Sequence, residues 1–335
     1  MKTSASLRLV AFVALCTGSA LAQNNDTSKV ELAVSPVAGS VSMIEGVGGF
    51  AGGNVGVSVG SDGVFIVDDE LESMSPKLQA ALAKLSKSPV RFVINTHWHG
   101  DHSGGNKAFG NSGAVIVAHD NVRQRLTASQ AEAQAKAGSP APAGGKSDPV
   151  LPVVTFSDDV TLHLNGEDVH VFHVPPAHTD GDAVVHFTKA NVVHTGDLFV
   201  SRGYPFVDLK SGGNFEGFIQ AADAVLAIAN DKTRIIPGHG PIAGRREVEA
   251  WRATLDTIRQ RVKALIAGGK TLEQAIAAKP TADLDAKVGG DFIKPDMIVE
   301  AAYRSLTGNK APASAAPAPA PKTPAPAPKT PAPAR

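Results

Sequence analysis

The feature that most constrains this chain is residues 96–102, which are Thr-His-Trp-His-Gly-Asp-His and directly follow the apolar run of residues 90–94. Neutral imidazole and carboxylate are the N and O ligands that zinc and similar divalent metals take in proteins. In an extended chain alternate side chains share one face, so we expect His97 and His99 to bind one ion. Asp101 and His102, which follow a glycine, can turn toward a second ion. The alternative is a solvated histidine-rich loop, but such tracts rarely follow a buried strand with an acidic residue between the histidines.

The N-terminal residues differ in composition from the middle of the 335-residue chain. Residues 1–22 carry Lys2 and Arg8, then a short apolar run and the small-x-small sequence Ala20-Leu21-Ala22, which together predict a secretory signal peptide. The apolar run is too short to span a membrane. Cys16, the one cysteine of the chain, lies in this peptide, so the mature chain would have no disulfide, thiolate ligand or cysteine nucleophile. We therefore expect a secreted or periplasmic protein.

Residues 309–335 are nearly all Ala and Pro with Lys-Thr inserted. Such a segment has no large apolar side chains with which to form a core, so it predicts a disordered tail; a tether to the cell envelope is the alternative. The 32 basic and 32 acidic residues of the whole chain balance. This balance favours a small-molecule substrate over nucleic acid or an anionic membrane.

Between these ends, short β-type runs separated by Gly, Asp and Ser occur in two series, each with helical stretches. Strands are predicted at residues 30–34, 41–44, 54–59, 64–67, 90–94, 114–118, 153–156, 160–164, 169–174, 183–187, 191–194 and 234–236. Helices are predicted at residues 76–87, 120–134, 215–229, 247–267, 271–278 and 295–306, and a loop at residues 135–150. The pair Asn165-Gly166 predicts a hairpin turn. This order suggests two β-sheets packed face to face with helices outside, although periodicity alone supports only an α/β or α+β fold.

Three further polar clusters each follow or separate predicted strands. They contain His178 within residues 177–182, Asp197 within residues 195–197, and His239 within the sequence Pro-Gly-His-Gly-Pro at residues 237–241. A single histidine after a strand is more often a hydrogen-bonded core or loop residue than a metal ligand. Four such clusters in one chain favour a shared metal site.

The ordered set His97, His99, Asp101, His102, His178, Asp197 and His239 resembles the metallo-β-lactamase superfamily over about residues 30–245. The resemblance implies a four-layer αβ/βα sandwich, which would occupy residues 23–308 together with C-terminal helices. It also implies two divalent ions, expected to be Zn²⁺. His97, His99 and His178 would bind the first ion and Asp101, His102 and His239 the second, with Asp197 as the bridge. A metal-bound hydroxide would attack a carbonyl group, and Asp101 would orient it and relay a proton.

The bridging position bears on the substrate. Members of the cysteine-ligand β-lactamase subclass have a thiolate where this chain has Asp197, and a lysine where it has Val200. Asp197 is instead similar to glyoxalase II and to lactonases. We therefore expect an ester, lactone, thioester or amide as the substrate, with β-lactams in doubt.

Several other residues are candidates for supporting roles. Asp68, after the run of residues 64–67, resembles the family's strand-end aspartate that supports the metal loop, and His194 lies close to Asp197 in sequence. The side chains that could contact a substrate are Trp98, Arg202, Tyr204, Phe206 and Lys210, each of which can also be an ordinary packed or loop residue. The remaining strand-face histidines are interpreted as structural: His119, His163, His170, His173 and His186.

Two other functions remain as alternatives. One is an oxidoreductase similar to the persulfide dioxygenases, which use a single iron. The other is a non-catalytic metal-binding protein of the same fold. The presence of all seven ligand residues argues against the second alternative, and the predicted secretion argues against the first, because its thiol substrate is mainly cytosolic.

Overall fold

The computed structural model describes residues 27–138, 148–288 and 292–308. The predicted signal peptide and the predicted Pro/Ala-rich tail lie outside these ranges. None of the helices in the described ranges has the length and apolar character needed to cross a bilayer.

The first sheet has seven strands in the described residues, in the order β1-β2-β3-β4-β5-β6-β7. Its strands are β1 (Glu31–Ala38), β2 (Val41–Val47), β3 (Val55–Gly60), β4 (Gly63–Val67), β5 (Val90–Ile94), β6 (Val115–His119) and β7 (Val154–Phe156). Strands β1 to β4 form an antiparallel meander, whereas β4, β5, β6 and β7 run parallel. The carboxyl ends of β4, β5 and β6 therefore meet at one edge of the sheet, where ligand sites of parallel sheets commonly lie.

The second sheet has five strands in the described residues, in the order β12-β11-β10-β9-β8. Its strands are β8 (Asp159–Leu164), β9 (Glu167–His173), β10 (Ala183–Phe187), β11 (Val192–His194) and β12 (Arg234–Ile236). Strands β11 and β12 are parallel, so their carboxyl ends also lie at one edge. The hairpin predicted at Asn165-Gly166 joins β8 to β9, and both residues have positive φ, 54° and 76°. Asn and Gly tolerate this conformation, which a two-residue hairpin turn requires.

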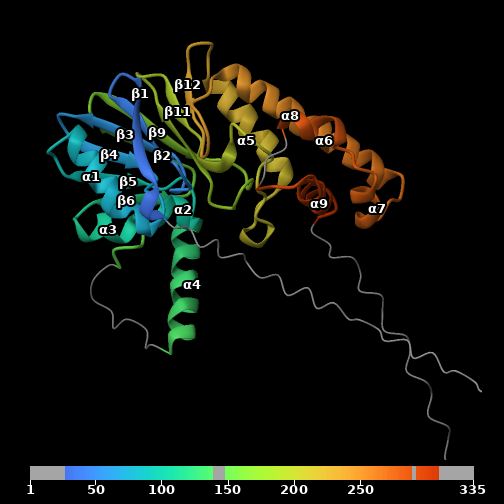
Figure 1. The fold of residues 1–335 in the computed structure, drawn as a ribbon, viewed down its shortest axis with the longest axis horizontal. Helices are drawn as coiled ribbons and strands as arrows, with labels where there is room; N and C mark the ends of the chain where they lie inside the picture. The colour runs from blue at the N-terminus through green and yellow to red at the C-terminus, as the bar shows by residue number, and fades with distance from the viewer. Residues whose placement is uncertain (1–26, 139–147, 289–291, 309–335) are drawn as a thin grey trace, which may run out of the picture.

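Helices cover the outer face of each sheet (Figure 1). The α-helices are α1 (Ser75–Leu85), α2 (Gly100–Ser103), α3 (Asn106–Asn111), α4 (Asp120–Ala137), α5 (Phe215–Ile228), α6 (Arg245–Ala267), α7 (Leu272–Ala277), α8 (Ala282–Val288) and α9 (Pro295–Leu306). Single turns of 3-10 helix occur at η1 (Thr27–Lys29), η2 (Glu72–Met74), η3 (Gly196–Leu198) and η4 (Leu209–Ser211). Helices α1 and α3 pack on the first sheet, and α5, α6 and α9 pack on the second. The molecule is thus an αβ/βα sandwich in four layers.

The alternation of buried side chains along the strands produces these layers. In β4, Phe65 and Val67 face the second sheet, while Val64 and Ile66 face helices α1 and α3. Phe65 stacks on Phe187 of β10 across the interface between the sheets, with ring centroids 5.7 Å apart. Because successive side chains of a strand point to opposite faces, a strand buried on both faces is apolar throughout.

The fold class predicted from the sequence is confirmed, and differences from the predicted elements are local. Helix α8 lies in a stretch for which no helix was predicted, and α4 continues three residues beyond the predicted end at residue 134. Helix α4 projects from the body of the molecule (Figure 1), with only Val122 and Leu126 buried. Such a helix has no amphipathic pattern by which the sequence could show its length.

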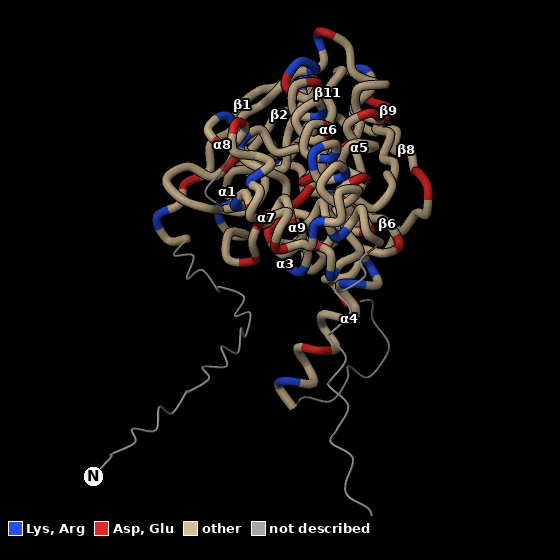
Figure 2. The backbone as a smooth tube through the Cα atoms, turned by 90° about the vertical axis from the view of Figure 1, so that its right-hand side faces the viewer, with Lys and Arg blue, Asp and Glu red and all other residues tan. Residues whose placement is uncertain are grey.

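Charged residues of both signs are interspersed over the face seen in Figure 2. That face carries no broad field of one sign, so any recognition there depends on individual side chains.

Candidate metal centre

Seven side chains from the strand ends of both sheets converge at one place. The loop after β5 holds His97 and His99, and α2 holds Asp101 and His102. From the second sheet come His178, between β9 and β10, Asp197 in η3 after β11, and His239 after β12. Their ligand atoms form three overlapping groups within 4.8 Å: His97, His99 and His178; His97, His102 and Asp197; and Asp101, His102 and His239.

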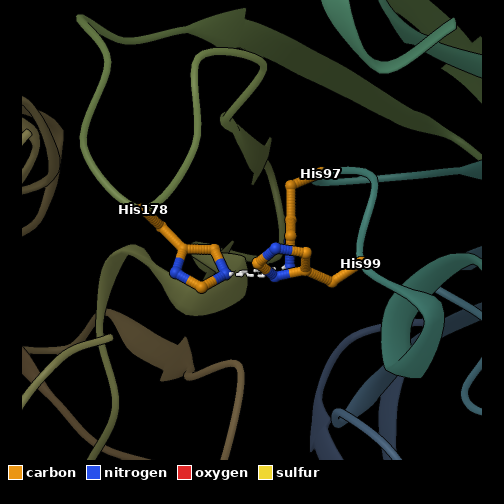
Figure 3. Close-up of side chains that lie close together, drawn as sticks. All are labelled: His97, His99 and His178. Carbon is orange, nitrogen blue, oxygen red and sulfur yellow. Dashed lines mark hydrogen bonds between the residues drawn. The ribbon is translucent and has the colours of Figure 1, made fainter. Parts of the chain in front are cut away.

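The first group brings three imidazole rings together (Figure 3). The Nε2 atom of His178 lies 3.2 Å from Nε2 of His97 and 2.8 Å from Nδ1 of His99. Each ring presents one nitrogen to the other two. Whether these nitrogens carry hydrogen depends on the partners of the opposite nitrogens.

The hydrogen-bond partners of the ring nitrogens that point away from the group determine which nitrogen of each ring carries the hydrogen. His178 Nδ1 lies 2.7 Å from the carbonyl oxygen of Phe206, which can only accept, so this nitrogen carries the hydrogen. His99 Nε2 donates in the same way to a carboxylate oxygen of Asp208 at 3.0 Å. His97 Nδ1 lies 3.1 Å from the Thr96 hydroxyl, which gives its own hydrogen to Asp68 and therefore accepts from the ring.

The inner nitrogens of the three rings are consequently bare lone pairs that face one another. Lone pairs at such distances repel, and no hydrogen is available to join them. A cation between them would turn this repulsion into three bonds, so these residues fit a metal ion.

The second group also turns ring nitrogens toward one point. His102 Nδ1 donates to Asp68 at 2.8 Å, so its Nε2 is the nitrogen that faces the group, 3.3 Å from Nε2 of His239. Asp101 Oδ2 lies 3.4 Å from the same His239 nitrogen. Two imidazole nitrogens and a carboxylate oxygen therefore face one point.

Asp197 lies between the two groups. Its Oδ1 is 3.2 Å from His102 Nε2 and 3.4 Å from His239 Nε2, and its Oδ2 is 3.5 Å from His178 Nε2. A Cβ on Gly238 would come within 1.9 Å of Asp197 Oδ1, so only glycine permits this approach. One carboxylate oxygen is thus turned toward each group, as a bridging ligand requires.

The electrostatics differ between the groups. Burial, helped by His99 and opposed by Asp197, lowers the pKa of His178 to about 4, and burial together with His102 lowers the pKa of His97 well below its usual value. Both rings are therefore neutral at pH 7, which is the form that binds metal.

In the second group the carboxylates outweigh burial. Burial lowers the pKa of His239, but Asp197 and Asp101 raise it to about 9, and Asp197, Asp101 and Asp68 raise the pKa of His102 in the same way. The carboxylates at this end therefore attract positive charge. A divalent cation would supply that charge without a proton.

Asp68 and His194, the two residues predicted to support the site, both form hydrogen bonds beside it. Asp68 accepts hydrogen bonds from Thr96 N at 2.7 Å, from the Thr96 hydroxyl and from His102. His194, fully buried, donates from Nε2 to the Asn54 carbonyl at 3.0 Å and accepts from Gly196 N, and so fixes the residue before Asp197.

Three supporting residues were not identified from the sequence. Asp208 orients His99, as described above, and Asp182 accepts hydrogen bonds from the backbone N–H groups of His178 and Thr179. Asn54 donates from Nδ2 to the carbonyl oxygens of Pro237 and Gly240, which flank His239. Asp182 lies within the polar cluster of residues 177–182 described above, whereas no local pattern distinguishes Asp208 or Asn54.

The side chains predicted to contact a substrate differ in their exposure and in their distance from the metal centre. Tyr204 is buried, 3% exposed, and its hydroxyl donates to Asp285 at 2.8 Å, so it cannot reach a substrate. Trp98 packs beside Ala118, Val122 and Leu126 at the base of α4. Arg202 and Lys210 are exposed, and Phe206 lies against His99 and His178.

The remaining histidines lie outside the three metal-ligand groups. His119 stacks on His173 at 3.9 Å, and His163 and His170 pair with the exposed aspartates Asp168 and Asp159. His186 lies half-buried on β10. No described contact gives any of them a role at the site.

A comparison with protein families decides the classification, because residues 48–239 match the model of the metallo-beta-lactamase superfamily. The chain belongs to the metallo-beta-lactamase superfamily. The matched range is more than half of the chain and ends at His239, the last of the seven predicted ligand residues, and it confirms the resemblance inferred from the sequence.

Curated relatives within the superfamily are hydrolases. The chain is 26% identical over 232 residues to a linear primary-alkylsulfatase of Pseudomonas sp. (strain ATCC 19151), an alignment that covers 59% of this chain and 43% of the relative. It is 26% identical over 154 residues to a hydroxyacylglutathione hydrolase of Pelagibacter ubique (strain HTCC1062), covering 45% of this chain and 52% of the relative. The chain thus spans about half the length of these relatives or less.

Solved structures share the fold. The DIM-1 metallo-beta-lactamase matches with a TM-score of 0.53 and 18% identity over 68% of this chain and 99% of that one. The sec-alkylsulfatase Pisa1 from Pseudomonas sp. matches with a TM-score of 0.65 and 17% identity over 83% of this chain and 50% of that one.

Proposed function

We propose that this protein is a secreted hydrolase that holds two divalent ions, zinc in the first instance, and cleaves an ester-type bond of a small molecule. The observation that supports this most directly is the arrangement of the inner imidazole nitrogens. In the first group they are bare lone pairs, in the second they face the Asp101 carboxylate, and Asp197 turns one oxygen toward each group. When bound, a metal pair supplies a water of lowered pKa and polarises the bond to be cleaved.

The side chains around the ions would position the reactants and move the proton. Burial raises the pKa of Asp101, but His102 and His239 outweigh it and lower the pKa to about 2, so the carboxylate is ionised at neutral pH. Its side chain is 23% exposed, at the solvent edge of the site. Its position would let Asp101 accept a hydrogen bond from a nucleophilic water, orient it and relay its proton toward solvent.

Esters, lactones and thioesters are the first substrates to consider, and amides, including β-lactams, the next. One curated relative is a hydroxyacylglutathione hydrolase, and this chain has Asp197 in place of the cysteine of common β-lactamases. A sulfate ester is a second candidate. It is favoured by the alkylsulfatase relative and by the 83% of this chain that aligns with the Pisa1 structure.

The test is metal analysis of the purified mature protein, followed on the same sample by hydrolysis of a cephalosporin, lactones, thioesters, carboxylic esters, phosphoesters and alkyl sulfates. We expect two zinc ions per chain, turnover of one ester class, loss of turnover in chelator and its recovery with zinc. His99→Ala should abolish turnover, whereas His170→Ala, on an exposed strand face, should not.

Other outcomes would favour the alternatives. One iron per chain with oxygen consumption on glutathione persulfide would indicate a dioxygenase. Bound metal without turnover of any class would indicate a binding protein. Secretion is tested separately, since the exported protein should begin at Gln23.

A further inference from the structure

The loop of residues 205–211 accepts hydrogen bonds from two of the predicted metal ligands on one side of the centre. The Phe206 carbonyl oxygen accepts from His178, and the Asp208 carboxylate accepts from His99. The ring of Phe206 stacks on His99 with centroids 6.1 Å apart and meets His178 edge-on at 5.8 Å. Whatever contacts this ring on its other side is therefore adjacent to the metal centre.

An apolar groove lies between this loop and α9. Its volume is about 160 Å³, and it is lined mainly by Pro205, Phe206, Leu209, Ile293, Met297 and Ala301. Glu300 is the one charged side chain among the described residues that line it, and Arg304 pairs with that carboxylate at 2.7 Å. The groove therefore offers almost no polar partners to an occupant.

Large apolar side chains are exposed at this groove. Phe206 is 37% exposed, Met297 43% and Phe292 73%, and the rings of Phe206 and Phe292 lie 6.1 Å apart. On the other side of the centre, Phe50 stacks on the ligand His239 at 5.7 Å and is 43% exposed. Contiguous apolar groups that remain exposed beside a polar site are typical of a surface that binds an apolar ligand.

We propose that this groove binds the apolar group of the substrate, an aryl ring or an alkyl chain of about six carbon atoms, while the adjacent centre holds the bond to be cleaved. The inference rests on the hydrolytic function proposed above and specifies its substrate class. The size follows from the volume, because an apolar cavity of ~150 Å³ holds one benzene molecule. A group bound against Phe206 would be separated from His99 and His178 by that one ring, close enough for the rest of the substrate to reach the centre.

Turnover and binding test the proposal separately. Turnover uses ethyl esters of straight-chain acids from acetate to decanoate, which carry no aryl ring, and alkyl sulfates of the same lengths, with release of acid followed by titration. Each methylene buried should raise kcat/KM by up to about fourfold until about six carbons are accommodated, after which the gain should stop. Binding uses calorimetry of methyl- and hexylphosphonate with the metal-loaded protein, and hexylphosphonate should bind at least about tenfold more tightly.

The variants are Met297→Asp, which places a carboxylate in the groove, Met297→Leu, which keeps it apolar, and Val153→Asp, which changes an exposed valine remote from it. Met297→Asp should lose the dependence on chain length and retain turnover of the acetate, whereas the other two should behave like the wild type. Chain-length dependence that survives Met297→Asp, or is absent from the wild type, would overturn the proposal. If no substrate is turned over but hexylphosphonate still binds more tightly, and Met297→Asp removes the difference, the groove is supported and the hydrolytic function fails.

Discussion

Asp208 Oδ2 lies 3.0 Å from His99 Nε2, on the opposite side of the ring from the nitrogen that faces His178. Burial raises the pKa of the Asp208 carboxyl, but the hydrogen bonds from His99 and Ser211 outweigh it and hold the pKa well below its usual value. An ionised Asp208 thus keeps the hydrogen of His99 on Nε2 and leaves Nδ1 free for a metal.

Asp208→Ala should weaken metal binding at the first group by about 10- to 100-fold, because His99 would lose both its tautomer and its orientation. Competition with a chromogenic chelator measures the affinity. Asp223→Ala, which removes an exposed partner of Arg252, is the control. Equal affinities in the two variants would show that Asp208 does not position His99.

Asp68→Asn should destabilise the metal-free protein by about 1–3 kcal/mol. Three donors surround the two Asp68 oxygens, namely Thr96 N, the Thr96 hydroxyl and His102 Nδ1, so the new amide group must face at least one of them. The midpoint and slope of urea unfolding measure the change. Asp159→Asn, on an exposed strand, should leave the midpoint in place, and the prediction is wrong if Asp68→Asn does so too.

Asn54→Ala should reduce occupancy of the second group while the first retains its ion. The substitution removes the two side-chain hydrogen bonds from Asn54 to the backbone on either side of His239, while the bond from Asn54 N to the Gly238 carbonyl remains. Metal per chain at limiting zinc measures the effect, with Asn111→Ala at an exposed helix end as the control. Loss of both ions together, or of neither, would contradict this assignment.

Glu70→Gln should flatten the pH dependence of stability. The Glu70 side chain is fully buried, neither of its oxygens has a partner, and burial raises its pKa from 4.5 to about 8. Between these values the unfolded chain has released the proton and the folded chain retains it, so stability falls as pH rises, by up to about 1.4 kcal/mol per pH unit.

Glutamine has nearly the same shape as glutamate and no titrating proton. The variant should therefore match the wild type near pH 4.5 and be more stable at pH 8, by on the order of 4 kcal/mol. Urea unfolding at both pH values measures the difference, and Glu72→Gln, exposed in η2, should show none. Parallel pH profiles for Glu70→Gln and the wild type would disprove the assignment.

Local chemistry explains why the fold, and the side chains that meet at the candidate metal centre, could be predicted. The apolar run of β5 followed by the histidine cluster, and the Asn165-Gly166 turn, are determined by neighbours in sequence. Asp68 directly follows the apolar strand β4, and Asp197 follows the end of β11 by three residues, so both positions stand out in the sequence.

The remaining features depend on contacts between distant residues. Asp208 supports His99 across 109 positions and Asn54 supports the His239 loop across more than 180, so neither leaves a local pattern. Tyr204 lies in the segment after Asp197 where a substrate contact was expected, but its ring turns into the core and its hydroxyl meets Asp285 of α8. Sequence position alone does not determine which way such a side chain faces.

The centre joins the two sheets, since His97, His99, Asp101 and His102 belong to the first and His178, Asp197 and His239 to the second. A bound ion would therefore act as a cross-link between the halves of the chain, and its affinity would add to the free energy of unfolding. Chelation would then do more than stop catalysis. It would also remove the link between the two sheets at their solvent-exposed edge. The folded protein would then unfold more readily when metal is scarce, so the metal supply would limit its stability as well as its activity.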